Sequence, residues 1–203
     1  GHGKVDRVHA LAKSCNRYFA EWGASLPSET LGQALKVLGI ETPHVPGAVL
    51  PQDRAALWCG VHPEFGCTAG SLLAALLAAT GADLLFLSNN RLLPLKTHGV
   101  LLQDLAQGNP ESLKELETAM ADIRRGMERA TTEGTAKEGL PWRWPALVKT
   151  GTSPSAEGKG IDGWAFALTP ARKAKTALLL YRPNARGKEA WASAVGALGL
   201  LHP

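Results

Sequence analysis

The chain is short of cysteine, of clustered charge and of long unbroken apolar runs. Its three cysteines are too few for the disulfide framework of a small secreted protein. Lysine and arginine are scattered, with no run of five, so the net charge of +4 does not indicate a nucleic-acid-binding surface. With 45% hydrophobic and 20% charged residues over 203 positions, the composition excludes intrinsic disorder and predicts a globular chain.

A strongly apolar stretch, residues 69–88, approaches the length of a membrane-spanning helix, but Gly81 and Asp83 interrupt it. A charged side chain at the centre of a bilayer costs about 2.5–3.5 kcal/mol on insertion scales. We therefore expect a buried helix from Thr68 to Thr80, stopped by Gly81 and followed by a short separate segment.

Cys59 and Cys67 bracket a turn-rich loop that contains His62. In an oxidising compartment this loop is compatible with a small disulfide. A metal site would use the same two thiols with His62, but their spacing fits no common zinc pattern. Two separate thiols are the favoured interpretation, and we expect neither a metal nor a cofactor.

The first 140 residues are predicted to be mainly helical. Apolar residues recur at three- and four-residue spacing between positions 5 and 23, which predicts a helix that ends at Gly23. A small break beside Ser14 and Asn16 would let both side chains point into a cleft. A second helix is predicted from Ser28 to just before Gly39, whereas residues 41–67 hold several prolines and form the least regular stretch.

The clearest helix is predicted from Asn109 to about Thr132. Asn109 is a good N-cap, and Pro110 suits the first helical turn. An apolar stripe then runs along one side of this helix, formed by Leu113, Leu116, Met120, Ile123 and Met127.

After residue 140 the pattern changes to strands, predicted over 145–150, 162–168 and 175–182, with a final helix over 189–198. Helices followed by a strand meander and a last helix predict an α+β fold: an antiparallel sheet with a C-terminal helix plus a helical lobe. We treat residues 1–203 as a single partial domain, with residues 1–140 as the mainly helical lobe and residues 141–203 as the strands and last helix.

Residues 149–153, Lys-Thr-Gly-Thr-Ser, end an apolar run and open a Ser/Gly-rich loop. This arrangement places the Lys149 cation at the rim of a strand. The hydroxyls of Thr152 and Ser153 are suited to hold an anionic group of a substrate.

Residues 147–181 resemble the end of a penicillin-binding protein transpeptidase domain, in the superfamily of serine D,D-peptidases and β-lactamases. That family has a Lys-Thr-Gly-Thr strand, then a strand containing tryptophan and proline, matched here by Trp164 and Pro170, then an apolar strand. Ala167 stands where the family usually has glycine. Upstream, residues 14–16 (Ser-Cys-Asn) resemble the Ser-x-Asn motif, and residues 134–136 (Gly-Thr-Ala) resemble the segment that precedes the active-site strand.

The resemblance implies three catalytic roles and an acyl-transfer chemistry. Ser14 would relay a proton to the leaving group. Asn16 would hydrogen-bond the substrate amide and hold the catalytic lysine. Lys149 would lower the proton affinity of the serine electrostatically.

The resemblance also implies a substrate-binding segment. Thr150 and Thr152 would engage the terminal carboxylate of the substrate, and the amide of Thr152 would be the second oxyanion donor. Gly151 would let the substrate backbone approach the strand, and Ser153 belongs to the same binding loop.

The Ser-x-x-Lys motif that carries the family's nucleophile is missing, because none of the nine serines has a lysine three positions later. We expect the nucleophile and its lysine base, with the first strands of the sheet, to lie upstream of residue 1. The favoured function is peptidoglycan D,D-transpeptidase-type acyl transfer. The alternatives are a catalytically inactive scaffold or binding module of cell-wall assembly, and a serine β-lactamase-like hydrolase.

The partners implied by the resemblance are peptidoglycan stem peptides ending in D-Ala-D-Ala, β-lactams and other cell-wall synthesis proteins, with no nucleic acid. The implied location is the bacterial periplasm or the exterior of the cell envelope. A segment absent from this chain would tether the protein to the inner membrane.

Overall fold

The computed structural model describes residues 3–26, 28–37, 51–62, 66–82, 86–88, 91–93, 103, 106–139, 145–155 and 158–201. The chain divides into two compact units. The first unit joins Gly1–Tyr18 to Arg124–Pro203 and contains the main sheet, and the second unit is Phe19–Ile123. Residues predicted as one helical lobe, 1–140, therefore contribute to both units.

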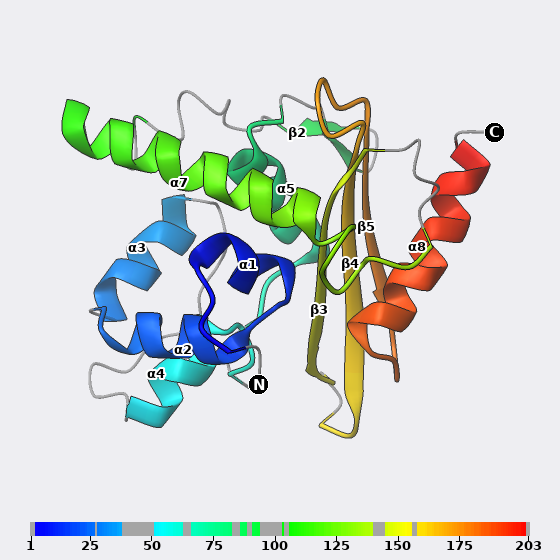
Figure 1. Ribbon diagram of the computed structural model, residues 1–203, viewed down its shortest axis with the longest axis horizontal. Coiled ribbons are helices and arrows are strands. Elements are labelled where there is room, and N and C mark those ends of the chain that lie inside the picture. Colours follow the sequence, from blue (N-terminus) through cyan, green and yellow to red (C-terminus); the bar gives the residue numbers. More distant parts are fainter. Residues whose placement is uncertain are drawn as a thin grey trace. The chain divides into compact units, whose positions relative to one another are not determined.

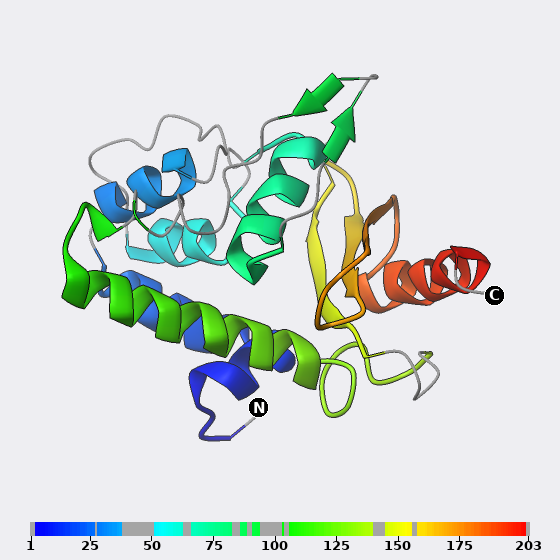
Figure 2. The same ribbon diagram turned by 90° about the horizontal axis from the view of Figure 1, so that it is seen from above.

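The first unit is built on a three-stranded antiparallel sheet (Figure 1). Its strands are β3 (Leu147–Pro154), β4 (Ile161–Thr169) and β5 (Thr176–Arg182), in the spatial order β3-β4-β5. Helix α8 (Gly187–Leu201) runs along one face of this sheet (Figure 2). This sheet with its C-terminal helix, together with the helices upstream, confirms the predicted α+β fold.

The core of the first unit lies between the sheet and α8. It is rich in alanine, which lets the helix and the strands approach closely. The buried residues of this core are Ala130, Ala136, Ala146, Val148, Ala165, Ala167, Ala190, Trp191, Ala194 and Leu198. The indole of Trp191 also donates a 2.8 Å hydrogen bond to the carbonyl of Glu138, so the residue is both buried and satisfied.

Side chains of a strand alternate between the two faces of a sheet, and this alternation assigns the residues of β3. Val148 packs in the core against α8. Thr150 and Thr152 therefore lie on the α8 face, whereas Lys149, Gly151 and Ser153 lie on the opposite face.

Glycines make the close contacts of β3 and β4 with the chain at the start of α8 possible. A Cβ on Gly187 would lie 2.6 Å from the carbonyl oxygen of Gly151, and a Cβ on Gly163 would lie 2.5 Å from that of Arg186. Both distances are shorter than any real Cβ contact, so the backbones touch only because these positions carry no side chain.

The second unit contains most of the helices: the larger part of α2 (Asn16–Ala24), α3 (Ser28–Val37), α4 (Pro51–Trp58), α5 (Ala69–Thr80) and most of α7 (Pro110–Arg129). A short hairpin joins β1 (Phe86–Ser88) to β2 (Arg91–Leu93). None of the helices in the described ranges is both long enough and apolar enough to cross a membrane.

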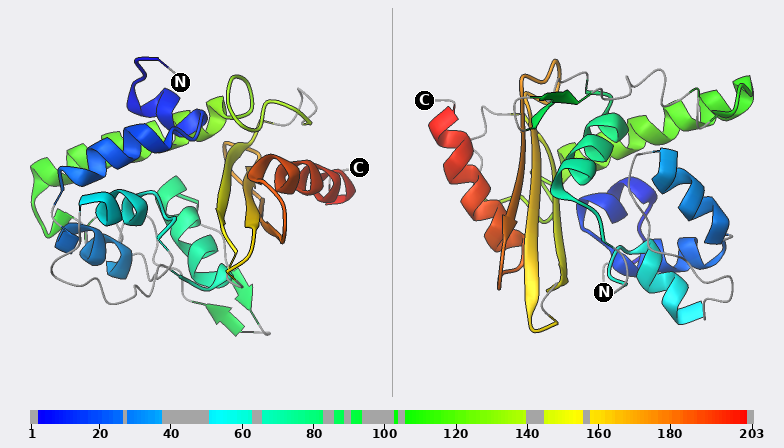
Figure 3. Two further views of the ribbon diagram at one scale, coloured as in Figure 1. Left: turned by 90° about the horizontal axis from the view of Figure 1, so that it is seen from below. Right: turned by 180° about the vertical axis from the view of Figure 1, so that it is seen from behind.

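Helices α5 and α7 follow the predicted boundaries closely. Thr68 caps the start of α5, and Gly81 ends it in the left-handed conformation. Asn109 accepts a 2.9 Å hydrogen bond from the amide of Glu111 at the start of α7. The predicted apolar stripe packs around Met120, with Leu113, Leu116 and Ile123 of α7 and Ala78 and Ala79 of α5. The ribbons of α5 and α7 lie beside each other accordingly (Figure 3).

None of the three cysteines forms a disulfide, so Cys59 and Cys67 are not joined. Burial raises the pKa of both the Cys59 and the Cys67 thiol. Among the described residues, no group of three or more histidine, cysteine, aspartate or glutamate side chains is placed to hold a metal ion.

Candidate active site

Ser14 lies in a tight turn that ends helix α1 (Arg7–Ala12). The amide of Ser14 donates to the carbonyl of Leu11, and the amide of Cys15 donates to that of Ala10 at 2.8 Å. This pair of hydrogen bonds commonly closes a helix around one left-handed residue. The helix predicted over residues 5–23 is therefore interrupted at residues 13–15 and resumes as α2 at Asn16.

The left-handed residue of this turn is Ser14 itself, with φ of 49°. Glycine is the usual residue there, and an L residue in this conformation costs about 1–2 kcal/mol. The left-handed conformation closes helix α1, but glycine would close it without this cost. The choice of serine here is therefore consistent with a function for its hydroxyl.

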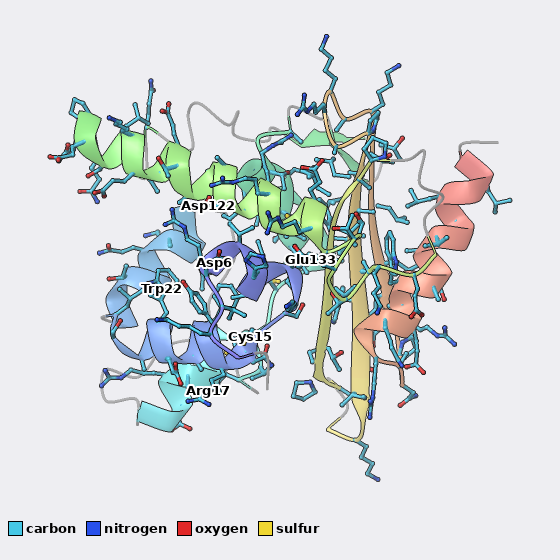
Figure 4. The ribbon with its side chains drawn as sticks, in the orientation of Figure 1. Asp6, Cys15, Arg17, Trp22, Asp122 and Glu133 are labelled. Atoms are coloured by element: carbon cyan, nitrogen blue, oxygen red, sulfur yellow. The ribbon has the colours of Figure 1, made fainter. Side chains whose placement is uncertain are left out.

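The turn is held in place by close packing against the end of α7 and the segment after it. A Cβ on Gly126 would lie 2.9 Å from the Leu11 side chain, and a Cβ on Gly134 would lie 2.1 Å from the carbonyl oxygen of Ala12. Cys15 is 8% exposed and turns inward from the same loop (Figure 4). The position of Ser14 is thus constrained by the tight packing of Leu11 and Ala12 before it and by the burial of Cys15 after it.

The ammonium of Lys149 meets the Ser14 hydroxyl. Lys149 Nζ donates a 2.6 Å hydrogen bond to Ser14 Oγ and a second, short one to the carbonyl of Thr150. An ammonium has three hydrogens, so within the described residues one is left for a ligand. The structure therefore brings together two residues that lie 135 positions apart in the sequence.

Burial lowers the pKa of Lys149 from 10.5 to about 8, because desolvation disfavours the charged form. The ammonium is therefore still the main form of Lys149 at neutral pH, but its desolvation lowers the stability of the folded chain. A buried ammonium whose pKa lies close to neutral pH is suited both to attract an anion and to exchange a proton.

The pH dependence of stability should report this burial. An unfolded Lys149 binds its proton up to about pH 10.5, whereas the folded chain releases it near pH 8. Burial of the ammonium therefore destabilises the protein fully below pH 8, and this cost fades as the pH rises to about 10.5. We expect Lys149→Met to be more stable than the wild type at pH 7, with a difference that shrinks between pH 8 and 10.5, as measured by denaturant unfolding. A difference that is constant across this range would contradict the desolvation of Lys149.

Thr150 was predicted to bind a substrate carboxylate, but its hydroxyl has an internal partner. The side chain is 4% exposed and donates a 2.6 Å hydrogen bond to Thr135 Oγ1. A hydroxyl has one hydrogen, so Thr150 would have to give up Thr135 in order to donate to a carboxylate. In this structure Thr150 serves to join the strand to residue 135.

Thr152 and Ser153 are better placed to donate. Thr152 is exposed, and its hydroxyl oxygen accepts a 2.9 Å hydrogen bond from the amide of Gly187, the first residue of α8. Ser153 Oγ accepts from the indole of Trp164 at 3.2 Å, and the Trp164 ring lies 4.7 Å from that of Tyr181. In both cases the serine or threonine oxygen accepts, which leaves its own hydrogen for a ligand.

Asn16 and Gly151 are the remaining predicted site residues. Asn16 is exposed at the first position of α2, two residues beyond Ser14. Gly151 is exposed on β3, and a Cβ there would meet only the Cβ of Trp164, at 3.8 Å. The space around Gly151 thus permits a close approach by another backbone, while the roles of both residues stay predictions.

Sequence reasoning gave no role to three residues that build the site. Thr135 accepts a hydrogen bond from Thr150, and the amide of Gly187 donates one to Thr152. Gly134 has no side chain that would clash with the carbonyl of Ala12. Residues 134–136 stood out only as a family landmark. Gly187 and its partner Thr152 lie 35 positions apart, so no local pattern identifies Gly187.

The chain was compared with known proteins. No family model and no curated protein matches it. Solved structures do match. A penicillin-binding protein (PBP2) from Helicobacter pylori is 22% identical, with a TM-score of 0.70, over 98% of this chain and 41% of that chain. The same protein in complex with MreC gives 22% identity and a TM-score of 0.69, over 98% and 42% of the two chains. Penicillin-binding protein A from Mycobacterium tuberculosis, as its imipenem acyl-enzyme, gives 18% identity and a TM-score of 0.63, over 98% and 49%.

The matched structures establish the fold, since nearly all of this chain aligns with each of them. The chain spans about 41–49% of the length of these three relatives. The chain therefore has the fold of part of a penicillin-binding protein transpeptidase domain, as the resemblance of its motifs implied.

Proposed function

We propose that residues 1–203 form the proton-relay and substrate-orienting part of a serine acyltransferase that recognises D-Ala-D-Ala stem peptides and reacts with β-lactams. The observation that carries this proposal is the 2.6 Å hydrogen bond between Lys149 Nζ and Ser14 Oγ. It joins two motif residues that lie 135 positions apart in the sequence. Ser14 has a strained backbone, and Lys149 is desolvated.

The chemistry assigned to the pair is proton delivery. A nucleophilic serine from outside residues 1–203 attacks the substrate carbonyl, and its proton passes to an adjacent base. The bond from carbonyl carbon to nitrogen then breaks, and the leaving nitrogen needs a proton. Because Lys149 donates to Ser14 Oγ, the hydroxyl hydrogen of Ser14 is available to that nitrogen, and a proton from Lys149 restores the hydroxyl. The proton that the base took from the nucleophilic serine then returns to Lys149, so the proton count balances.

Substrate binding is assigned to β3 and its surroundings. Within the described residues β3 is an edge strand, so a peptide can add to it by backbone pairing. On the face of β3 opposite α8, the Ser153 hydroxyl and the third hydrogen of Lys149 would hold the terminal carboxylate. Thr152 lies on the other face and would reach the carboxylate across the exposed edge of the strand. The N-terminus of α8 at Gly187 adds a partial positive charge behind Thr152, and Asn16 would bond the substrate amide.

Support for the biological setting comes from the matched proteins. One of them is described in complex with MreC and another as an acyl-enzyme with imipenem. By analogy we propose a role in cell-wall cross-linking on the outer side of the inner membrane, with stem peptides, β-lactams and cell-wall synthesis proteins as partners.

Labelling the full-length protein with a fluorescent penicillin tests this proposal. We expect a covalent adduct, mapped by peptide mass spectrometry to a serine that is outside residues 1–203 and has a lysine three positions later. Ser14→Ala should slow labelling by about 100- to 10,000-fold, the range for loss of a general acid or base. Ser25→Ala is the matched control, because the Ser25 hydroxyl is exposed and bonds the nearby carbonyl of Trp22.

Two other outcomes identify other functions. An adduct on Ser14 itself would indicate a serine–lysine dyad, which the 2.6 Å contact and the lowered pKa of Lys149 also fit. Reversible binding without any adduct would favour a non-catalytic binding module of cell-wall assembly, which the absence of Ser-x-x-Lys from residues 1–203 also fits.

A further inference from the structure

We propose that Thr135 is a positioning residue that sets the distance between Ser14 and Lys149. This inference rests on the proposed function, because the distance matters only if the pair relays a proton. Thr135 lies in the segment between α7 and β3 and touches neither member of the pair through a hydrogen bond of its own in the described structure.

Thr135 bonds to the chain on both sides of the site. Its amide donates a 3.2 Å hydrogen bond to the carbonyl of Ala12, two residues before Ser14. Its hydroxyl oxygen accepts the 2.6 Å hydrogen bond from Thr150, one residue after Lys149. One residue thus connects the turn that carries Ser14 to the strand that carries Lys149.

The surroundings of Thr135 are built to hold it still. Its neighbour Ala136 is 1% exposed and donates a 3.0 Å hydrogen bond to the carbonyl of Ala130, itself 1% exposed. Gly134 has no side chain, and this absence lets the segment lie directly against Ala12. On the strand side Thr150 is 4% exposed, so its hydroxyl depends on Thr135 for a partner.

The contact between Ser14 and Lys149 needs this support because forming it is unfavourable in two ways. Ser14 is held in a left-handed conformation, and Lys149 is held away from water. If the bridge through Thr135 is lost, a small movement of the turn relieves the strain and admits water to the ammonium. A displacement of about 1 Å at a reacting group can lower a rate by about 100-fold.

The test replaces only the hydroxyl of Thr135. Thr135→Val keeps the shape and the amide bond to Ala12 but offers Thr150 no acceptor, whereas Thr135→Ser restores the acceptor. Thr132→Val is the matched control, because the exposed Thr132 hydroxyl bonds the nearby carbonyl of Arg129. In the full-length protein we expect Thr135→Val to be acylated by a fluorescent penicillin about 10- to 100-fold more slowly. Thr135→Ser and Thr132→Val should stay within a few-fold of the wild type.

A second readout separates positioning from general destabilisation and does not need acylation. In the full-length protein labelled with ¹³Cε-lysine, the Lys149 resonance should titrate near pH 8 in the wild type and in Thr132→Val. In Thr135→Val we expect its pKa to rise toward 10.5, because water reaches the ammonium. An unchanged Lys149 titration in Thr135→Val, or a Thr135→Ser variant that titrates like Thr135→Val, would overturn the role of Thr135. A wild type that takes no penicillin would instead count against the proposed function, and the titration would still decide the positioning role.

Discussion

Lys149→Met is expected to slow acylation of the full-length protein by about 100- to 10,000-fold while making the fold more stable. Methionine fills the same space without a charge, so the hydrogen bond to Ser14 Oγ is lost and the cost of burying an ammonium disappears. From the lowered pKa we expect a gain of about 1–3 kcal/mol in the free energy of unfolding at pH 7. Stopped-flow labelling and urea unfolding on the same preparations measure the two effects.

A substitution that lowers the acylation rate and raises the stability of the fold indicates that the charge it removes serves function and not stability. Lys159→Met is the control, because Lys159 is an exposed lysine of the loop between β3 and β4. It should change neither quantity by much. A Lys149→Met protein that labels normally, or that unfolds more easily than the wild type, would show that Lys149 is an ordinary structural lysine.

Gly134→Ala should have the largest structural effect of any single methyl group added near the site. Its Cβ would lie 2.1 Å from the carbonyl oxygen of Ala12 and 2.7 Å from the Cα of Ala130, and neither backbone atom can turn aside as a flexible side chain would. We expect a loss of at least about 1–3 kcal/mol in the free energy of unfolding. The same clash pushes the turn that carries Ser14 away from Lys149, so labelling should fall as well.

The same substitution elsewhere provides the comparison. Gly196 lies on the exposed side of α8, and a Cβ added there would meet nothing within 4 Å. Gly196→Ala should therefore stabilise the helix by about 0.5–1 kcal/mol, since glycine is a poor helix former. Equal effects of the two substitutions on unfolding by urea would contradict the tight fit of residue 134 against Ala12.

Local patterns predicted the elements of this chain where burial and turn chemistry agreed. The N-cap at Asn109, the apolar stripe through Met120 and the stop at Gly81 are each set by neighbours in the sequence. The helix α4, over Pro51–Trp58, was not predicted, because the prolines just before it indicated an irregular segment.

The break at Ser14 shows where local patterns stop being informative. Apolar spacing alone predicted one continuous face from Val8 to Trp22, but a helix that ends and restarts no longer keeps its two halves on one face. Trp22, at the far end of the predicted face, is 53% exposed. Nothing in the spacing signals that Ser14 takes the left-handed conformation, since glycine is the residue expected there.

The sequence predicted which residues belong to the candidate site but only some of the contacts between them. The motifs identified Ser14 and Lys149, and in the structure Lys149 Nζ lies 2.6 Å from Ser14 Oγ. Side-chain alternation along β3 places both Thr150 and Thr152 with Val148 on the α8 face, which the motif alone did not indicate. The link through Thr135 depends on how residues 12, 135 and 150 meet in space, which a sequence pattern does not encode.

A double-mutant cycle on Ser14 and Lys149 tests the central claim most directly. Acylation rates of the full-length wild type, Ser14→Ala, Lys149→Met and the double variant give the coupling between the two side chains. If they act as one relay, the double variant should label about as slowly as the slower single variant. If the two losses multiply instead, the residues act independently, and the contact between them is not the working part of the site.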